Sequence, residues 1–238
     1  MTKRTLDRIL QSQGFGTRKH CRELVRAGEV RVGGQAVADA TAEFDTEGLA
    51  FEVFGEEWLF RQSVYLALNK PPGYECSRKP SHHPGVLTLL PEQFAWRDVQ
   101  PVGRLDHDTT GLLLLSDDGA FIHAQSSPRR HVPKTYVATT QAPVGDELVD
   151  MLEAGVQLKD EPAPLACRAR RLEPHAVEMI LDEGKYHQVK RMLAAAGNHC
   201  VALRRAAIGG LTLAALGLAE GAWTYLDDTQ LALLAERP

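Results

Sequence analysis

The sequence lacks most of the features that mark secreted, membrane-bound and metal-binding proteins. It contains four cysteines, scattered without a Cys-x-x-Cys pair, and nine histidines without the spacing of metal ligands. This pattern predicts reduced, buried thiols and no metal site. No apolar run approaches the length of a membrane span, and the first residues carry no apolar signal segment. We therefore expect a cytoplasmic protein without a membrane partner.

Cofactor-binding glycine motifs are missing as well. Neither a GxxxxGK[ST] loop nor a GxGxxG loop occurs, and there is no internal repeat or low-complexity tract. These two loops are the usual signatures of phosphate cradles for ATP and dinucleotides. Their absence argues against an ATP-dependent or NAD-dependent enzyme.

A strong positive charge is the third missing feature. The net charge is −4, which at first sight argues against a nucleic-acid-binding protein. The charge is unevenly distributed, however, because residues 1–35 carry eight basic and three acidic residues, a local net charge of +5. A basic N-terminal segment therefore keeps nucleic-acid binding open.

The pattern of residues 1–60 predicts a separate small module. Leu6, Ile9 and Leu10 recur at helical spacing, and Thr17 suits the N-cap of a second helix that ends near Gly28. Residues 30–32 then alternate as a short strand before a Gly-Gly turn. Residues 60–63 are expected to link this module to the rest of the chain.

Basic side chains in this module fall on one face of each predicted helix. Residues four apart in sequence lie on the same side of a helix, and guanidinium groups bind phosphates with a fork geometry. The order helix, helix, strand and turn, with arginines on one face, resembles an S4 RNA-binding domain; a merely solvated basic face is the alternative. The resemblance implies RNA contacts by Arg4, Arg8, Arg18, Lys19, Arg22 and Arg26.

Residues 61–238 read as a larger domain of strands and helices. Strands are expected at residues 64–68, 135–140 and 176–181, and helices at residues 188–196 and 229–235. Another strand is expected at the four consecutive leucines 112–115, which predict burial on both faces.

The segment 103–111 (GRLDHDTTG) carries the clearest chemical signal. Two glycines bracket a turn that places Asp106 at the start of the leucine strand. A carboxylate held beside a buried strand loses hydration, and carboxylates placed at such a cost are often catalytic. Three other interpretations of the segment are a calcium loop, half of an aspartic protease site and a capped turn. The calcium loop lacks its later ligands and the protease site lacks its second carboxylate, whereas the capped turn stays open on these residues alone.

The same segment resembles the signature of the RsuA-type pseudouridine synthases and their large-subunit relatives. The runs NKPPGY (69–74), KTY (134–136) and GKYHQVKRM (184–192) resemble further motifs of this family, in the same order. The resemblance implies that Asp106 is the catalytic carboxylate. It also implies that Tyr136 stacks on the target base, and that Lys190, or as second choice Arg191, pairs with Asp106. Arg104 would reach into the gap left by a flipped uridine, and Lys70 and Arg191 would contact RNA.

These resemblances lead to one set of expectations. The fold should be α+β, with an S4-like module (1–60) and a synthase domain (61–238) built on a mainly antiparallel mixed sheet flanked by helices. The enzyme should isomerise a uridine of 16S rRNA (position 516 in the usual numbering), within a partly assembled small ribosomal subunit. It should act as a monomer without a metal or other cofactor. Whether the Asp attacks C1′ or C6, or assists glycal formation, stays open.

Three other functions remain to be weighed. A synthase for 23S rRNA would share every motif, because the motifs contain the catalytic residues and do not specify which uridine is the target. A catalytically silent S4-type RNA-binding protein would not require Asp106, Tyr136 and Lys190 together. A metal-dependent hydrolase would require a ligand cluster that the sequence does not display.

Overall fold

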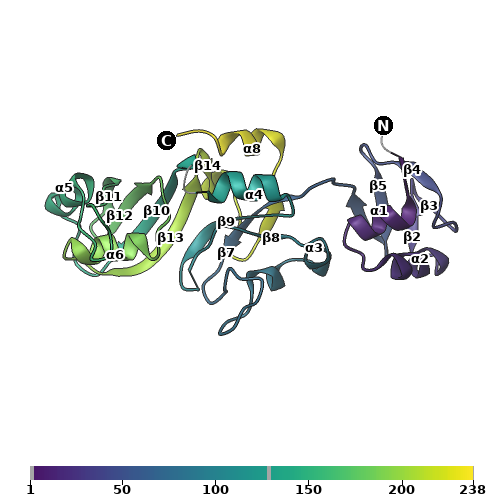
Figure 1. Ribbon diagram of the computed structural model, residues 1–238, viewed down its shortest axis with the longest axis horizontal. Helices are drawn as coiled ribbons and strands as arrows, with labels where there is room; N and C mark the ends of the chain where they lie inside the picture. The colour runs from purple at the N-terminus through teal and green to yellow at the C-terminus, as the bar shows by residue number, and fades with distance from the viewer. Residues whose placement is uncertain (1–2, 128–129, 238) are drawn as a thin grey trace. The chain divides into compact units, whose positions relative to one another are not determined.

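The computed structural model describes residues 3–127 and 130–237. Contacts between its Cα atoms divide the chain into two units (Figure 1). Unit 1 comprises Met1–Val64 and Leu90–Val99, and unit 2 comprises Tyr65–Leu89 and Gln100–Pro238. Among the described residues, no helix combines the length and the apolar character that crossing a membrane requires.

Unit 1 packs two helices against a small antiparallel sheet. The helices are α1 (Leu6–Ser12) and α2 (Arg18–Arg26), and α2 is capped by Thr17, whose side chain accepts a hydrogen bond from the backbone N–H of His20. The sheet has the order β3 (Gln35–Ala36), β2 (Val30–Val32), β5 (Ala50–Val53) and β6 (Glu56–Leu59). β1 (Lys3–Thr5) pairs with β4 (Glu43–Asp45), and the short α3 (Glu92–Trp96) completes the unit.

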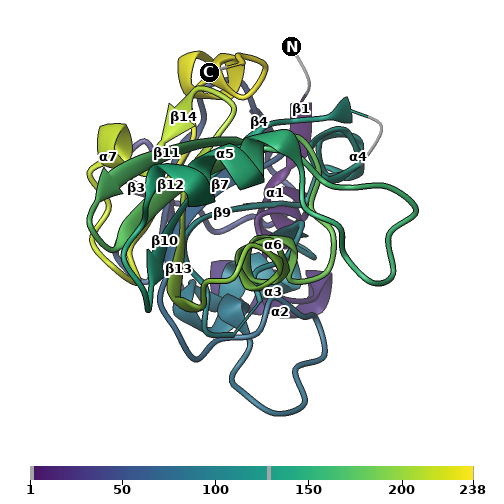
Figure 2. The same ribbon diagram turned by 90° about the vertical axis from the view of Figure 1, so that its left-hand side faces the viewer.

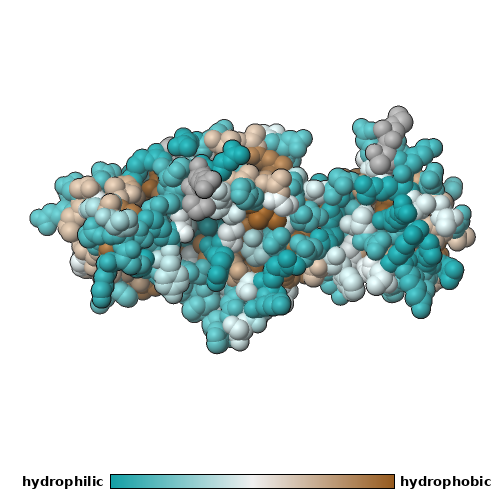
Figure 3. All heavy atoms as spheres, viewed as in Figure 1, coloured by the Kyte–Doolittle hydropathy of each residue, from teal (hydrophilic) through white to brown (hydrophobic). Residues whose placement is uncertain are grey.

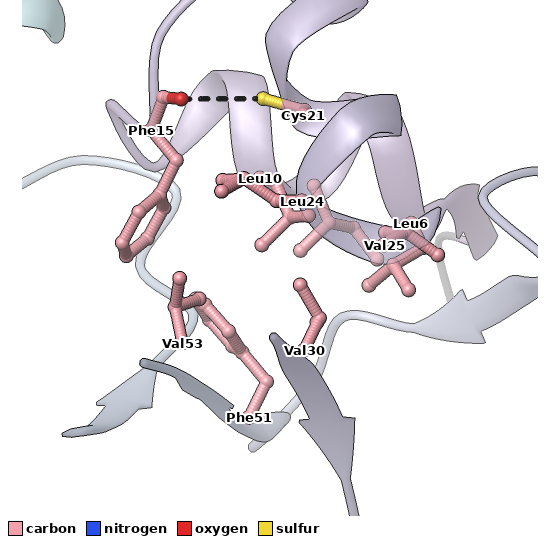
Figure 4. Close-up of a cluster of buried hydrophobic side chains, with 10 residues drawn as sticks. Leu6, Leu10, Phe15, Cys21, Leu24, Val25, Val30, Phe51 and Val53 are labelled. Carbon is pink, nitrogen blue, oxygen red and sulfur yellow. Dashed lines mark hydrogen bonds between the residues drawn. The ribbon is translucent and has the colours of Figure 1, made fainter. Parts of the chain in front are cut away.

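The core of unit 1 forms between these layers (Figure 4). Burial of a large apolar side chain stabilises a fold by roughly 1.5–3 kcal/mol, so the apolar faces of α1 and α2 hold the sheet in place. The helical pattern of the sequence is confirmed here, since the predicted inward residues are buried. The labelled core side chains are Leu6, Leu10, Phe15, Cys21, Leu24, Val25, Val30, Phe51 and Val53.

Unit 2 is built on one large, mainly antiparallel sheet. Its main path is β11 (Arg168–Glu173), β12 (Ala176–Leu181), β10 (Lys134–Thr140), β13 (Cys200–Ile208), β9 (Thr110–Ser116), β7 (Tyr65–Lys70) and β15 (Trp223–Tyr225). β8 (Gln100–Val102) pairs with β9, and β14 (Leu211–Thr212) pairs with β13. Only the contact between β13 and β9 is parallel among the pairings of the described strands. The predicted α+β fold with a mixed, mainly antiparallel sheet is confirmed.

Helices cover this sheet in different places (Figures 1 and 2). α5 (Asp146–Ala154) packs on β11, α6 (Gln188–Ala195) and α7 (Leu213–Leu216) on β13, α4 (Gly119–Ser126) on β8 and β9, and α8 (Asp228–Leu233) on β14. The predicted helices at 188–196 and 229–235 therefore exist within one or two residues. Two of the four cysteines, Cys21 and Cys76, are buried as predicted, whereas Cys167 and Cys200 are partly exposed.

β9 occupies the position that its four leucines predict. It runs between β7 and the parallel β13, and Leu112 to Leu115 are buried. Gly111, the second residue of β9, lies opposite Arg205 of β13 and has a φ of 103°. A Cβ atom there would stand 2.2 Å from the Arg205 carbonyl oxygen, so only glycine lets the two backbones approach. The Arg205 Nε atom donates to the Leu112 carbonyl at 2.7 Å, and this hydrogen bond also joins β13 to β9.

Candidate active site

A pocket of about 230 Å³ opens in unit 2 between the loop that precedes β9 and the segment that precedes α6. The loop contributes Arg104 and Asp106, and β10 contributes Tyr136. The structure thus brings together three of the residues that the motifs singled out. The remaining lining residues are Leu105, Thr109, Leu181, Glu183, Gly184, Lys185, Tyr186, His187, Gln188, Val189 and Leu203.

Lys70 fixes the loop that carries Asp106. Its side chain is fully buried, and its Nζ atom donates to the carbonyls of Pro71, His107 and Thr109 at 3.1, 3.2 and 2.8 Å. Burial lowers the pKa of Lys70, against the opposing effects of Cys76, Asp108 and Asp106. The predicted contact of Lys70 with RNA is therefore wrong: a buried ammonium group with three carbonyl partners is an anchor for the backbone and cannot reach a phosphate.

Asp106 keeps part of its carboxylate exposed within the pocket. Its side chain is 31% exposed, and its Oδ1 atom lies 3.2 Å from Nε2 of His187. His187 precedes α6 and adopts the left-handed conformation, with φ 48° and ψ 33°. A half-exposed carboxylate with one side-chain contact retains acceptor capacity for a ligand.

The structure gives Lys190 and Arg191 of the 184–192 motif other partners than Asp106. Lys190 Nζ bonds both carboxylate oxygens of Asp108 at 2.7 and 2.8 Å. The guanidinium group of Arg191 pairs with Asp160 and donates to the Tyr186 carbonyl. The predicted ion pair between Asp106 and Lys190, or its alternative with Arg191, is thus replaced by Asp108–Lys190. The physical reason is geometric, because Asp108 stands two residues further along the same loop and presents both oxygens to Lys190.

Tyr136 and its neighbours form the opposite wall. Tyr136 is only 8% exposed, so its ring is held in place by packing on the sheet. Two residues earlier on β10, Lys134 is bonded to the Val132 carbonyl at 2.7 Å. Burial, together with the charge of Arg205, lowers the pKa of Lys134 to about 8, although Asp182 opposes the shift. Lys134 and Arg205 belong to a second pocket, which shares Arg104 and Tyr136 with the first and also contains the carboxylates of Asp182 and Glu183.

The basic residues of unit 1 are partly engaged with a buried carboxylate. Arg18 and Arg22 each place Nε on the same oxygen of Asp7, at 2.8 and 2.7 Å, while their side chains remain 41% and 40% exposed. Arg4 donates to Gln62 and lies over the ring of Phe60. Arg8, Lys19 and Arg26 are exposed. Strongly hydrophilic side chains cover the region of α1 and α2 on the face shown in Figure 3.

Two residues of the site escaped the sequence analysis. His187 lies inside the 184–192 motif, for which the sequence predicted roles only for Lys190 and Arg191, and its left-handed backbone has no sequence signal. Arg205 stands next to Arg204 in β13, and the sequence did not indicate that Arg205 is buried while Arg204 is exposed. Among the described residues, no cluster of three or more His, Cys, Asp or Glu side chains has the arrangement of a metal site.

Comparisons with known families agree with the geometry of both units. A family model described as RNA pseudouridylate synthase matches residues 64–195, and an S4 domain model matches residues 4–41. A solved structure described as a pseudouridylate synthase superposes with a TM-score of 0.68 at 31% identity, covering 97% of this chain and 99% of that chain.

Relatives of this chain carry consistent names. It is 46% identical over 173 residues to the ribosomal small subunit pseudouridine synthase A of Escherichia coli K12, covering 71% of this chain and 72% of the relative. The Yersinia pestis protein of the same name is 39% identical over 236 residues, 95% of this chain and 96% of the relative. An uncharacterized RNA pseudouridine synthase of Bacillus subtilis is 36% identical over 97% of this chain and 98% of the relative. The chain belongs to the RNA pseudouridylate synthase family, whose members are RNA isomerases, and it carries the S4 domain of an RNA-binding protein.

Proposed function

We propose that this enzyme converts one uridine of 16S rRNA to pseudouridine and that Asp106 is the reacting carboxylate. The observation that supports the proposal most directly is the position of Asp106, half exposed in a pocket whose walls include Tyr136 and Arg104. The small-subunit address is inferred from the names of the Escherichia coli and Yersinia pestis relatives.

The reaction requires a uridine that has left its base stack. Breaking the glycosidic bond, turning the base and rejoining it through C5 is impossible inside a stacked helix, so the nucleotide must flip into the pocket. In this proposal Tyr136 stacks on the flipped base, because aromatic faces bind nucleobases without regard to sequence. Arg104, which is exposed at the pocket, fills the space that the base leaves in the RNA.

Lys190 acts in this proposal through Asp108. Its ammonium group holds both oxygens of Asp108, and this pair ties α6 to the loop that carries Asp106. Burial raises the pKa of Asp108, but the hydrogen bond and the charge of Lys190 outweigh burial and lower it overall. Asp108 therefore stays ionised near neutral pH, and its ion pair with Lys190 joins the loop to α6.

Unit 1 supplies affinity for the RNA backbone. Its exposed basic side chains contact phosphates, which positions the RNA but does not read its sequence. The substrate is then a partly assembled small ribosomal subunit, where rRNA structure presents the target uridine.

A carbodiimide primer-extension map tests the chemistry and the address together. Naked 16S rRNA, naked 23S rRNA and partly assembled small subunits are incubated with the wild-type enzyme and, in parallel, with Asp106→Asn. We expect a new stop in 16S rRNA that the variant does not produce. A stop confined to 23S rRNA would mean that the enzyme is a pseudouridine synthase with a 23S target. An equal stop with Asp106→Asn would mean that Asp106 is not the reacting carboxylate.

A further inference from the structure

His187 occupies a backbone conformation that histidine adopts rarely. Its φ of 48° and ψ of 33° lie in the left-handed region, at the residue before α6. Residues other than glycine persist there only when their surroundings determine the conformation, and such residues gather at functional sites. The side chain makes no capping hydrogen bond to α6, so helix capping does not explain the conformation.

Neighbouring bonds hold this turn in place. The side chain of Gln188, which is buried, accepts from the Lys185 backbone N–H at 2.9 Å and donates to Glu183 at 3.2 Å. The His187 ring stacks on the ring of Tyr186, with centroids 3.9 Å apart and an interplanar angle of 18°. Tyr186 is 75% exposed, and its carbonyl accepts from Arg191 at 3.2 Å. The orientation of the imidazole is thus set by the turn and by the stacked ring.

In this orientation Nε2 of His187 lies 3.2 Å from Oδ1 of Asp106. The lysines of this region have other partners: Lys190 binds Asp108, Lys70 binds three carbonyls, and Lys185, which also lines the pocket, binds Glu161. Both His187 and Asp106 line the pocket.

We propose that His187 is a positioning residue for Asp106: its Nε2–H donates to the carboxylate and sets the direction in which the free oxygen faces the flipped uridine. The inference rests on the proposed role of Asp106 as the reacting carboxylate. Small misplacements of a reacting group cost about 100-fold in rate, so the orientation that this turn gives to the imidazole matters for turnover.

The test uses substitutions that separate the ring from the backbone. His187→Gly accepts the left-handed conformation without strain and leaves a cavity for free imidazole. His187→Gln places an amide N–H near the position of Nε2. His131→Gly is a matched control, because His131 has the same φ of 48° in the same unit. Turnover of the full-length variants is followed on the rRNA substrate in single-turnover and steady-state assays.

We expect kcat of His187→Gly to fall about 10- to 100-fold with little change in KM for the RNA. Added imidazole should recover part of this loss, His187→Gln should retain more activity than His187→Gly, and His131→Gly should behave as wild type. A wild-type kcat for His187→Gly would overturn the proposal, and so would a loss that neither imidazole nor glutamine relieves. Neither result would contradict the proposed function, as long as the wild-type enzyme turns over the RNA and Asp106→Asn does not.

A second measurement is independent of turnover. In protein labelled with ¹⁵N-histidine, the His187 Nε2 resonance is assigned by its absence from His187→Gln. We expect it to move in Asp106→Ala, because the acceptor of its hydrogen bond is gone. An unmoved resonance would overturn the proposal whatever the enzyme does with RNA.

Discussion

Asp7 in unit 1 and Asp106 in unit 2 are both carboxylates in contact with basic side chains, but their surroundings are opposite. Asp7 is fully buried: one oxygen accepts from Thr5 at 2.6 Å, and the other accepts from Arg18 and Arg22 at 2.8 and 2.7 Å. Asp106 is 31% exposed and has His187 at 3.2 Å. A carboxylate whose acceptor sites are filled by the protein stabilises the fold, whereas one with free acceptor sites at a pocket is available for a substrate. Four changes test this difference, in order of decreasing effect.

The largest effect is expected for Asp106→Asn. The amide has nearly the same shape but neither the charge nor the basicity of the carboxylate, so turnover should fall by about 10⁴-fold or more. The free energy of unfolding should change by less than about 1 kcal/mol, since the side chain is partly solvated. Tritium release from RNA labelled at uridine C5 measures the first quantity and urea unfolding the second. If the variant kept substantial turnover, or lost much stability, Asp106 would be a carboxylate that stabilises the fold, as Asp7 is, and not the reacting group.

Asp7→Asn should show the reverse behaviour. It leaves Arg18 and Arg22 without their shared anion and buries an amide in place of a paired charge, so the free energy of unfolding should drop by about 3 kcal/mol. The value lies at the low end of the range for buried pairs because both arginines are free to turn toward solvent. Turnover per folded molecule should be unchanged. Urea unfolding is the measurement. A variant as stable as wild type would show that the ion pairs of Asp7 with the two arginines do not contribute to the free energy of unfolding.

Acid should narrow the stability difference between wild type and Asp7→Asn. Burial raises the pKa of Asp7, but the hydrogen bonds from Thr5, Arg18 and Arg22 outweigh it and hold the pKa well below its ordinary value. A carboxyl group with a lowered folded-state pKa contributes its full stabilisation above its unfolded pKa of about 3.9 and loses it as the pH falls further. Unfolding curves between neutral pH and about pH 3 should therefore converge on the acidic side. A difference that widens with acid would contradict the assigned direction.

The smallest effects separate two arginines of α2. Arg26→Gln should weaken RNA binding and flatten its salt dependence, by about 0.7–0.9 in the logarithmic slope for each phosphate that the side chain neutralises. Its stability should stay within about 0.5 kcal/mol of wild type, because Arg26 is exposed. Arg18→Gln should lower both affinity and stability, because Arg18 also pairs with Asp7. Fluorescence anisotropy over a salt series measures the slopes, with Arg31→Gln on β2 as the control; equal slopes for all variants would mean that the basic face of α2 is only solvated.

Local patterns predicted much of the fold. The α2 cap at Thr17, the buried leucine strand and the helix that begins at Gln188 appear where the pattern placed them. Each depends on interactions within a few residues, such as side-chain capping or the spacing of apolar positions. Gly111 was recognised as a turn residue, but its stricter role as a close contact with β13 depends on Arg205, which lies 94 residues further along the chain (205 − 111).

The site was predicted in its residues and not in its pairings. The motifs brought Arg104, Asp106 and Tyr136 to one pocket. The resemblance implied that Lys190, or Arg191, pairs with Asp106, whereas the structure pairs Lys190 with Asp108. Both acidic residues lie on one loop, so the choice depends on side-chain directions. The domain boundaries 1–60 and 61–238 and the roles of the site residues stay predictions.

The sequence by itself determined the family motifs, the order of the main elements and the basic character of the N-terminal segment, because these are properties of neighbouring residues and of the side chains themselves. Only the tertiary structure decided that Lys70 is an anchor, that Asp7 holds two arginines and that His187 faces Asp106. Each of these depends on atoms that are distant in sequence and on how far they are withdrawn from water. Burial decides whether a charged group serves the fold or remains free for a substrate, because the cost of losing hydration must be met by partners that only the folded chain supplies.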